Sequence, residues 1–151
     1  MTKHEALIRV TFELAASARR KGNHPFGALL AQDGRILQTA ENSVNSDNDV
    51  TRHAELNLIS QATRQLDAAV LSQVTLYTST EPCAMCAGAI FWAGIPEIVY
   101  GCAAETLGAL AGGEFVVPCR HVFSFGKREV KVTGPLLAEE AAIVHDGFWP
   151  V

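Results

Sequence analysis

Apolar residues recur three or four positions apart along the first twenty residues of the chain. This is the spacing of one face of a helix, and it predicts a helix over about residues 3–20. The predicted apolar face consists of Ala6, Leu7, Val10, Leu14 and Ala18. Gly22 and Pro25 follow and are expected to end the helix.

Two neighbouring apolar runs predict a β-hairpin. The first covers residues 27–32, the second covers residues 35–40, and Asp33–Gly34 separates them. Asp-Gly between two such runs is a strong signal for two antiparallel strands joined by a tight turn. Residues 42–49 are rich in Asn, Ser and Asp, which is the composition of a loop.

The rest of the chain alternates between helical and strand patterns. Helices are predicted over residues 52–66 (with Thr51 as the capping residue), 83–93 and 138–145, and strands over residues 74–78, 97–100 and 129–133, while residues 108–117 fit neither pattern. Strands that alternate with helices favour a sheet covered by helices on both faces. The opening hairpin makes this sheet mixed instead of purely parallel.

Length and composition indicate a single globular domain over residues 1–151, without a linker or a repeat. Apolar residues make up 48% and charged residues 19% of the chain. The longest apolar run, residues 83–95, is too short to cross a bilayer, and the charged residues 3–5 do not resemble a secretory signal. We therefore expect a cytoplasmic protein with no membrane partner.

The charge balance argues against nucleic acid as a partner. The formal net charge is -4, whereas proteins that bind phosphate backbones usually carry a basic face. The basic run at residues 19–21 closes the first predicted helix, where cations interact favourably with the helix dipole. A large nucleic-acid partner is therefore not expected.

Two short motifs carry the candidate chemistry, His-Ala-Glu at residues 53–55 and Pro-Cys-Ala-Met-Cys at residues 82–86. Cys83 and Cys86 share one face at the start of a predicted helix, and the helix dipole favours their thiolates. His53 also begins a predicted helix. Histidine and cysteine are ligands that zinc prefers, and three protein ligands leave the open position of a catalytic zinc site.

Two other interpretations of the cysteines stay open. A Cys-x-x-Cys pair at a helix start also occurs in thioredoxin-like redox proteins, but that function leaves the His-Ala-Glu motif unexplained. A structural zinc site needs a fourth ligand, for which Cys102 and Cys119 are candidates. Both of these cysteines are better explained as small buried residues than as zinc ligands.

Glu55 indicates what the metal would be used for. It lies two positions from His53, so on a helix it need not point the same way and can act beside the metal instead of binding it. Zinc lowers the pKa of a water molecule that it binds, and a neighbouring carboxylate can take up the proton. His-x-Glu followed by Pro-Cys-x-x-Cys is the established signature of zinc deaminases that act on nucleobases.

With these motifs the chain resembles the cytidine deaminase-like superfamily, in particular the branch of guanine deaminases and tRNA adenosine deaminases. Residues 25–28 (Pro-Phe-Gly-Ala), Asn42, residues 53–55 and residues 77–90 carry the resemblance, which extends over most of residues 5–105. It implies a three-layer α/β/α sandwich with a mixed five-stranded sheet and a homodimer. It also implies one Zn²⁺ per subunit, held by the two motifs, and a glutamate of the first motif as the proton shuttle.

The resemblance also suggests how a base is held. It implies that Phe26 stacks on the base, that Asn42 binds its edge and that the backbone N–H of Ala54 contacts the ring or its carbonyl. Phe26 and Trp92 are closer to the guanine deaminase side of the branch and are taken as substrate contacts. The alternatives are that both are core aromatics and that Asn42 is a turn residue.

The match fades after residue 105, where substrate choice is decided. Leu107 stands near the position at which guanine deaminases carry an acidic residue, and Glu105 and Glu114 are possible substitutes. Residues 145–149 could close over a pocket, in this subunit or in its partner, as the C-terminal segments of guanine deaminases do.

Three hypotheses about function follow. The first is a hydrolytic deaminase of a free nucleobase or nucleoside, with guanine or a related purine preferred. The second is a tRNA adenosine deaminase, which the acidic balance disfavours. The third is a zinc-stabilised binding module without catalysis.

Overall fold

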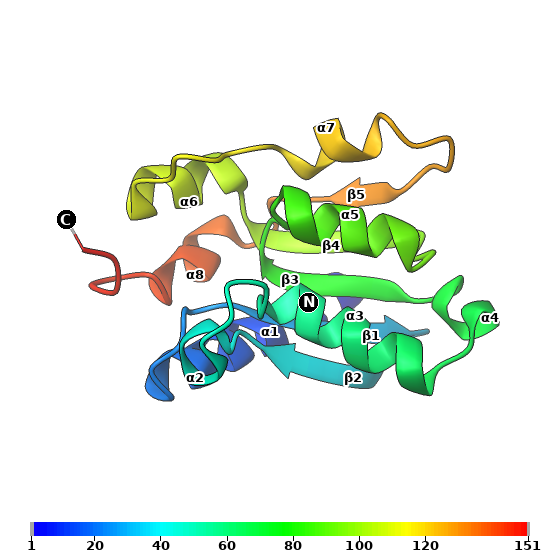
Figure 1. Cartoon of the computed structure of the whole chain (residues 1–151), viewed down its shortest axis with the longest axis horizontal. Coiled ribbons are helices and arrows are strands. Elements are labelled where there is room, and N and C mark those ends of the chain that lie inside the picture. Colours follow the sequence, from blue (N-terminus) through cyan, green and yellow to red (C-terminus); the bar gives the residue numbers. More distant parts are fainter. Residues whose placement is uncertain (1, 151) are drawn as a thin grey trace.

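A computed structural model describes residues 2–150 of the chain (Figure 1). The strands are β1 (Gly27–Gln32), β2 (Arg35–Glu41), β3 (Thr75–Thr80), β4 (Glu97–Cys102) and β5 (Lys131–Thr133). The helices are α1 (Lys3–Arg20), α2 (Val44–Asp47), α3 (Ala54–Gln65), α4 (Ala68–Leu71), α5 (Ala84–Trp92), α6 (Ala104–Ala111), α7 (Cys119–Phe123) and α8 (Ala138–Ile143). Among the described residues, no helix combines the length and apolar character needed to cross a membrane.

The strands form one mixed sheet in the order β2-β1-β3-β4-β5, which confirms the predicted five-stranded sheet. β1 pairs antiparallel with both β2 and β3, while β3, β4 and β5 run parallel. The hairpin is also confirmed. Its turn residues Asp33 and Gly34 have φ of 51° and 80°, the positive values that a tight two-residue hairpin turn requires.

Alternation along the strands builds two apolar cores, one on each face of the sheet. The core beneath α3 and α5 contains one residue from each central strand: Leu30, Leu76 and Ile98. The core beneath α1 contains the sequence neighbours of these residues: Leu29, Tyr77 and Val99. Neighbouring strand residues point to opposite faces, so three central strands serve both cores. The three-layer α/β/α prediction is confirmed (Figure 1).

Several predicted boundaries are corrected by the structure. Thr51 does not cap α3: its hydroxyl donates to Asp49 Oδ1 at 2.6 Å, and the N-cap residue is His53. The predicted loop over residues 42–49 contains the single turn α2, and the undecided segment over residues 108–117 holds the end of α6. The last strand is shorter than predicted, because it pairs with β4 only over Lys131–Thr133.

The chain passes very close to itself where α1 crosses the start of β1. A methyl group at Gly27 would lie 2.5 Å from Leu14 Cβ and 2.7 Å from the backbone nitrogen of Ala15. The backbone of one helix therefore rests directly on the strand that follows Phe26, and only glycine fits there.

We expect Gly27→Ala to lower the free energy of unfolding by about 2–3 kcal/mol, because the added carbon overlaps a helix backbone that cannot move aside alone. Chemical denaturation with urea measures the change. Gly88→Ala is the matched control, because nothing lies within 4 Å of the added carbon in α5 and alanine is the better helix former. An equal loss in both variants would contradict this account of Gly27.

Candidate active site

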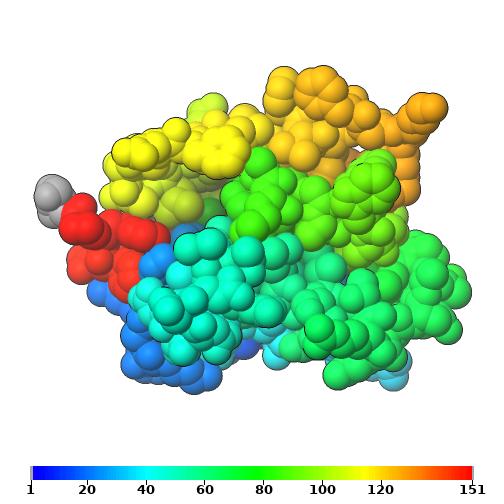
Figure 2. Space-filling model, viewed as in Figure 1, coloured from blue at the N-terminus to red at the C-terminus, as the bar shows by residue number. Residues whose placement is uncertain are grey.

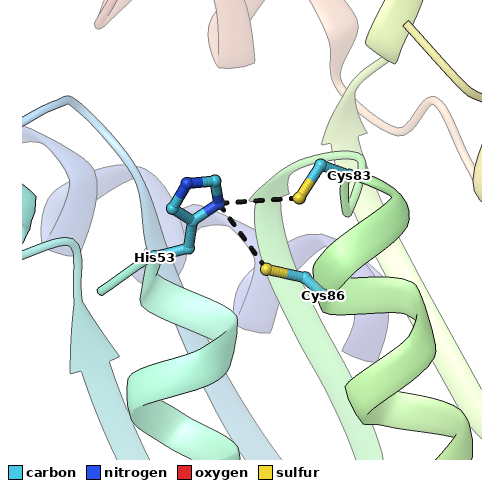
Figure 3. A group of neighbouring side chains, drawn as sticks. All are labelled: His53, Cys83 and Cys86. Carbon is cyan, nitrogen blue, oxygen red and sulfur yellow. Dashed lines mark hydrogen bonds between the residues drawn. The ribbon is translucent and has the colours of Figure 1, made fainter. Parts of the chain in front are cut away.

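His53, Cys83 and Cys86 come together at the N-terminal ends of α3 and α5 (Figure 3). His53 is the N-cap residue of α3 and Cys83 that of α5, while Cys86 lies in the first turn of α5. The Sγ atoms of both cysteines are 3.6 Å from His53 Nδ1. The three ligand atoms all lie within 4.8 Å of one another.

This cluster fits a tetrahedral zinc ion. With Zn–S bonds of about 2.3 Å and Zn–N bonds of about 2.0 Å, tetrahedral ligand atoms stand roughly 3.6 Å apart. The distances from Nδ1 to the two sulfur atoms agree with that value. Among the described residues, no fourth His, Cys, Asp or Glu side chain joins this group, so a tetrahedral ion held here would keep one position for water or substrate.

The electrostatics of the cluster favour a bound cation. The hydrogen bond from Cys86, helped by His53, lowers the pKa of the Cys83 thiol to about 4. Cys86, which shares one proton with Cys83 and is buried, has a raised pKa. The contact with the Cys83 sulfur raises the pKa of His53. A thiolate is therefore present even without metal, and its charge is one that zinc would neutralise.

Glu55 lies beside the cluster in the first turn of α3 and is 5% exposed. Burial, and secondarily the negative charge of Cys83, raises its pKa to about 7. A carboxyl group with such a pKa can both accept and release a proton near neutral pH, which is the requirement for a proton shuttle. The geometry is thus compatible with the role that the resemblance implies for Glu55.

Glu81 is a site residue that the sequence analysis missed. Its buried carboxylate accepts the backbone N–H of Ala104 at 2.9 Å and that of Cys119 at 2.6 Å. One side chain therefore fixes the first residues of α6 and α7 to the end of β3, two positions before Cys83. A glutamate directly before Pro-Cys in the motif was the available signal, but its partners lie far along the chain.

A small cavity of about 100 Å³ lies against Cys83. Its apolar wall comes from α6 and the residues that follow, including Leu107, Phe115 and Val116. Leu107 is thus at the site, as its position in the sequence indicated. Glu105 and Glu114 are both exposed, and neither lines this cavity.

Of the four predicted substrate contacts, Ala54 lies directly beside a metal ligand, and Phe26 and Asn42 lie next to each other. Ala54 is the first residue of α3, directly after His53. Asn42 is 2% exposed and its backbone N–H donates to the carbonyl of Phe26 at 3.1 Å, so these two residues are neighbours. The Asn42 side chain also has a turn role, because its Oδ1 accepts the N–H of Val44 at 3.0 Å.

Trp92 is not brought to the cluster. It is the last residue of α5, whose first turn carries the cysteines, and eight helical steps place it about 12 Å further along the axis. Its side chain is 86% exposed. Within one chain, Trp92 is therefore neither a neighbour of the zinc ligands nor a core residue.

The C-terminal residues pack on the turn of their own chain that contains His24 and Phe26. The Trp149 ring centroid is 5.5 Å from that of His24 and 6.0 Å from that of Phe26. His145 lies 5.5 Å from Phe26. Phe26 therefore already contacts two rings of this segment.

A separate hollow of about 560 Å³ lies over residues 120–132, and none of the predicted site residues lines it. Its two arginines, Arg120 and Arg128, donate hydrogen bonds to backbone carbonyls of the same chain. Arg128 donates to the carbonyls of Ile95 and Phe91 at 2.7 and 2.6 Å, and Arg120 donates to the carbonyl of Val132. We place the chemistry at the His-Cys-Cys cluster, because none of these three side chains lines the hollow.

Comparison with known proteins gives the same picture. The family model described as "Cytidine and deoxycytidylate deaminase zinc-binding region" matches residues 1–102. A probable cytosine deaminase of Schizosaccharomyces pombe is 38% identical over 97% of this chain and 93% of its own length. A guanine deaminase of Bacillus subtilis is 42% identical over 72% of this chain and 70% of its own length.

Other similar proteins have names that indicate different substrates. A tRNA-specific adenosine deaminase 2 of Xenopus tropicalis is 36% identical over 91% of this chain and 84% of its own length. Among solved structures, a guanine deaminase from Nitrosomonas europaea superposes with a TM-score of 0.81 at 26% identity, covering 93% of this chain and 81% of that one. These relatives share a reaction type but differ in substrate.

We expect Cys86→Ser to lower zinc content well below one ion per chain, because a hydroxyl is a far poorer zinc ligand than a thiolate. Metal analysis of the purified protein measures this. Cys102→Ser is the control, since Cys102 is buried but lies outside the cluster. Retention of zinc by the Cys86 variant, or its loss from the Cys102 variant, would show that the metal is bound elsewhere.

The buried His145 makes stability depend on pH. Burial, and then the charge of Arg19, lowers the pKa of His145 to about 4, whereas an unfolded histidine titrates near about 6.5. The unfolded chain therefore binds a proton that the folded chain does not, and the free energy of unfolding falls as pH drops from about 6.5 towards about 4.

Between pH 7 and pH 5 we expect the wild type to lose about 2 kcal/mol more than His145→Gln, which cannot titrate. Denaturation of the zinc-loaded proteins at both pH values measures this, and zinc release affects both proteins alike. His121→Gln, which removes an exposed histidine, should keep the wild-type slope. Equal slopes for the wild type and the His145 variant would rule out the assigned pKa shift.

Proposed function

The chain belongs to the cytidine and deoxycytidylate deaminase zinc-binding family, and from that premise we propose that it hydrolyses the exocyclic amino group of a free nucleobase or nucleoside, guanine or a related purine by preference. The observation that carries this proposal is the buried Glu55 beside the His53, Cys83 and Cys86 cluster. A site that only stabilised the fold would not need a carboxyl group buried next to the metal ligands. This disfavours the non-catalytic binding module.

The metal, Glu55 and Ala54 would each have a separate role in the reaction. When bound, zinc supplies the Lewis acidity that activates water near neutral pH. Glu55 would take one proton from the attacking water and transfer it to a ring nitrogen. It would then take the proton of the new hydroxyl on the reacting carbon and deliver it to the amino group, so that the C–N bond breaks, a carbonyl forms and ammonia leaves. The backbone N–H of Ala54, which directly follows His53, would donate to the base next to the reacting carbon.

We propose that Phe26 and Asn42 hold the base. Their backbones are joined by the hydrogen bond from Asn42 to Phe26, so the ring and the amide form one unit at the entrance of β1. Phe26 would contact the face of the base, and the amide of Asn42 would bind its edge. Trp92 takes no part in this arrangement within one chain.

A small substrate is favoured over tRNA for two reasons. The net charge of -4 provides no general attraction for phosphate, and the arginines of the large hollow bind backbone carbonyls of the protein. The C-terminal segment also covers the Phe26 turn, which narrows the approach to the cluster. An anticodon loop needs a wider and more basic approach than a free base does.

Cytosine is the second candidate. The S. pombe relative, a probable cytosine deaminase, matches 97% of this chain and therefore includes the C-terminal segment, whereas the B. subtilis guanine deaminase matches 72%. The cavity of about 100 Å³ beside Cys83 is also small. These observations make cytosine the first alternative to a purine.

We further propose that the protein is a cytoplasmic homodimer. Trp92 and Met85 leave apolar surface exposed on α5, at 86% and 38% of their respective areas. Exposed apolar surface of this kind is typical of interfaces. A second subunit over α5 would cover it and shield the helix that carries both cysteines.

We expect Glu55→Gln to lower kcat by about 10²–10⁴-fold while one zinc per chain remains bound, because the amide cannot transfer protons. The assay is ammonia release by zinc-loaded protein from guanine, guanosine, adenine, adenosine, cytosine, cytidine and a tRNA anticodon stem-loop. Glu139→Gln, an exposed residue of α8, is the matched control and should keep full activity.

The outcomes distinguish the hypotheses. Turnover of a free base or nucleoside that is lost in Glu55→Gln supports the proposal and names the substrate. Turnover of the stem-loop alone would move the function to tRNA editing. Activity that survives the Glu55→Gln change would show that Glu55 is not part of the mechanism. No ammonia release from any of the compounds tested would favour a binding module.

A further inference from the structure

Asn57 is a half-buried residue of α3 that the proposed reaction does not use. It lies one turn after the metal ligand His53, and its backbone N–H donates to the carbonyl of His53 at 2.9 Å. Its side chain reaches the end of β2, where Nδ2 donates to the carbonyl of Glu41 at 2.9 Å and to Ser43 Oγ at 2.9 Å. Glu41 and Ser43 are the residues directly before and after Asn42. One amide group of α3 therefore holds Asn42 from both sides.

The chemistry of the amide suits these two acceptors. Its nitrogen carries two hydrogens, so Asn57 can donate to a carbonyl and to a hydroxyl at the same time. The hydroxyl of Ser43 gives its own hydrogen to Asp47 Oδ2 at 2.7 Å, which leaves the Ser43 oxygen as an acceptor for Asn57. Neither a carboxylate nor an apolar side chain of the same size can donate both bonds.

The segment between Ser43 and Arg52 is closed at the same place. The backbone N–H of Ser43 donates to the carbonyl of Arg52 at 2.9 Å, and Asn57 Nδ2 lies 3.4 Å from that carbonyl. Arg52 directly precedes His53. Asn42 is therefore held beside the residues that lead into the metal ligand, and Asn57 lies where these two stretches of chain meet.

The α2 part of this segment has a separate attachment. Asn23, which follows α1, accepts the backbone N–H of Ser46 at 2.9 Å and donates to the Ser46 hydroxyl at 2.8 Å. Figure 2 shows the segment, in cyan, at the surface between the blue end of α1 and the green residues of α3. A change at Asn57 should therefore release the Asn42 end of the segment and leave the α2 part in place.

Asn57 lies outside the group of residues that are proposed to contact the base. Together with Glu41 and Ser43 it lines a polar hollow of about 320 Å³. Neither Asn42, Glu55 nor any of the metal ligands lines this hollow. We therefore expect Asn57 to influence a bound base through the position of Asn42.

We propose that Asn57 is a positioning residue that fixes the amide of Asn42 relative to the metal ligand His53 and thereby sets how tightly the base binds. The inference rests on the proposed function, because it takes Asn42 as the residue that binds the edge of the base. Glu55 and the zinc ligands do not depend on the Asn57 side chain for their contacts with one another. Loss of that side chain therefore weakens binding of the base and leaves the chemical step nearly unchanged.

The first test is Asn57→Leu, which keeps the size of the side chain and removes its hydrogen bonds. In zinc-loaded protein we expect KM for the base found in the ammonia assay to rise about five- to tenfold, with kcat changed less than about threefold. Gln61→Met is the matched control. Gln61 lies one turn further along α3 and also donates to a carbonyl of β2, that of Thr39 at 3.1 Å, but it does not touch the neighbours of Asn42. Its KM should stay within about twofold of the wild type.

A double-mutant cycle separates positioning from a merely structural role. If Asn57 acts through Asn42, then Asn57→Leu should change KM by less than about twofold in an Asn42→Ala background, because the group that it positions is already missing. A merely structural role would raise KM by the same factor in both backgrounds. That additive result would overturn the inference.

Hydrogen exchange gives a readout that does not depend on activity. In Asn57→Leu the backbone N–H groups of Asn42 and Ser43 should exchange about tenfold faster or more, whereas that of Ser46 should be unchanged. Unchanged exchange at Asn42 and Ser43 would show that Asn57 does not hold this part of the chain. Faster exchange with a wild-type KM would show that the position of Asn42 does not set affinity. Either result overturns the inference while deamination itself stands.

Two further measurements keep the inference open to refutation. If Asn57→Leu does not fold, Ser43→Ala removes one of the two acceptors, and wild-type exchange and KM in that variant would overturn the inference. If no base is deaminated, the proposed function fails, and the dissociation constants of the same bases, measured by calorimetry, replace KM. Weaker binding to Asn57→Leu than to the wild type would then still support the inference, and equal or absent binding would overturn it.

Discussion

Two helix N-termini meet at one edge of the sheet, and the site depends on that meeting. α3 precedes β3, with the short helix α4 between them, and α5 follows β3; α3 and α5 pack on the same face over one apolar core. Their first residues therefore face each other, with His53 Nδ1 3.6 Å from each sulfur. Unpaired N–H groups and the positive end of the helix dipole favour thiolates and a carboxylate at this point, so the fold prepares the ligands electrostatically as well as geometrically.

The burial that makes these groups reactive also lowers the stability of the folded chain. A carboxyl group and two thiols are removed from water around a place where a cation belongs, and each is disfavoured in its charged form unless it has a partner. The structure compensates with short contacts inside the cluster. The metal therefore supplies stability to the apolar core beneath α3 and α5 in addition to chemistry, because it neutralises charges that this core would otherwise have to tolerate.

Patterns within a few residues of one another predicted the secondary structure and the metal motifs. They could not predict contacts between segments that lie far apart in the sequence. The hairpin, the mixed sheet and the metal ligands follow from turn residues, alternation and motif spacing, each within a few positions of the chain. The role of Glu81 depends on N–H groups 23 and 38 residues away, which no spacing rule reports. Trp92 lies at the far end of α5 from the cysteines within one chain, so the predicted contact between Trp92 and a base stays a prediction. Thr51 had the chemistry of a cap but a nearer partner in Asp49.

The carboxylate of Glu81 binds both ends of the segment between Ala104 and Cys119, and this has an evolutionary consequence. The segment is closed into a loop by one side chain that lies between β3 and α5, so its interior can change in length and composition while its ends stay fixed. Because this loop supplies the apolar wall of the cavity beside Cys83, that wall can diverge independently of the residues that hold the metal. A family built in this way can acquire new substrates by replacing a single loop, and its relatives can share a metal centre while differing in the base that they deaminate.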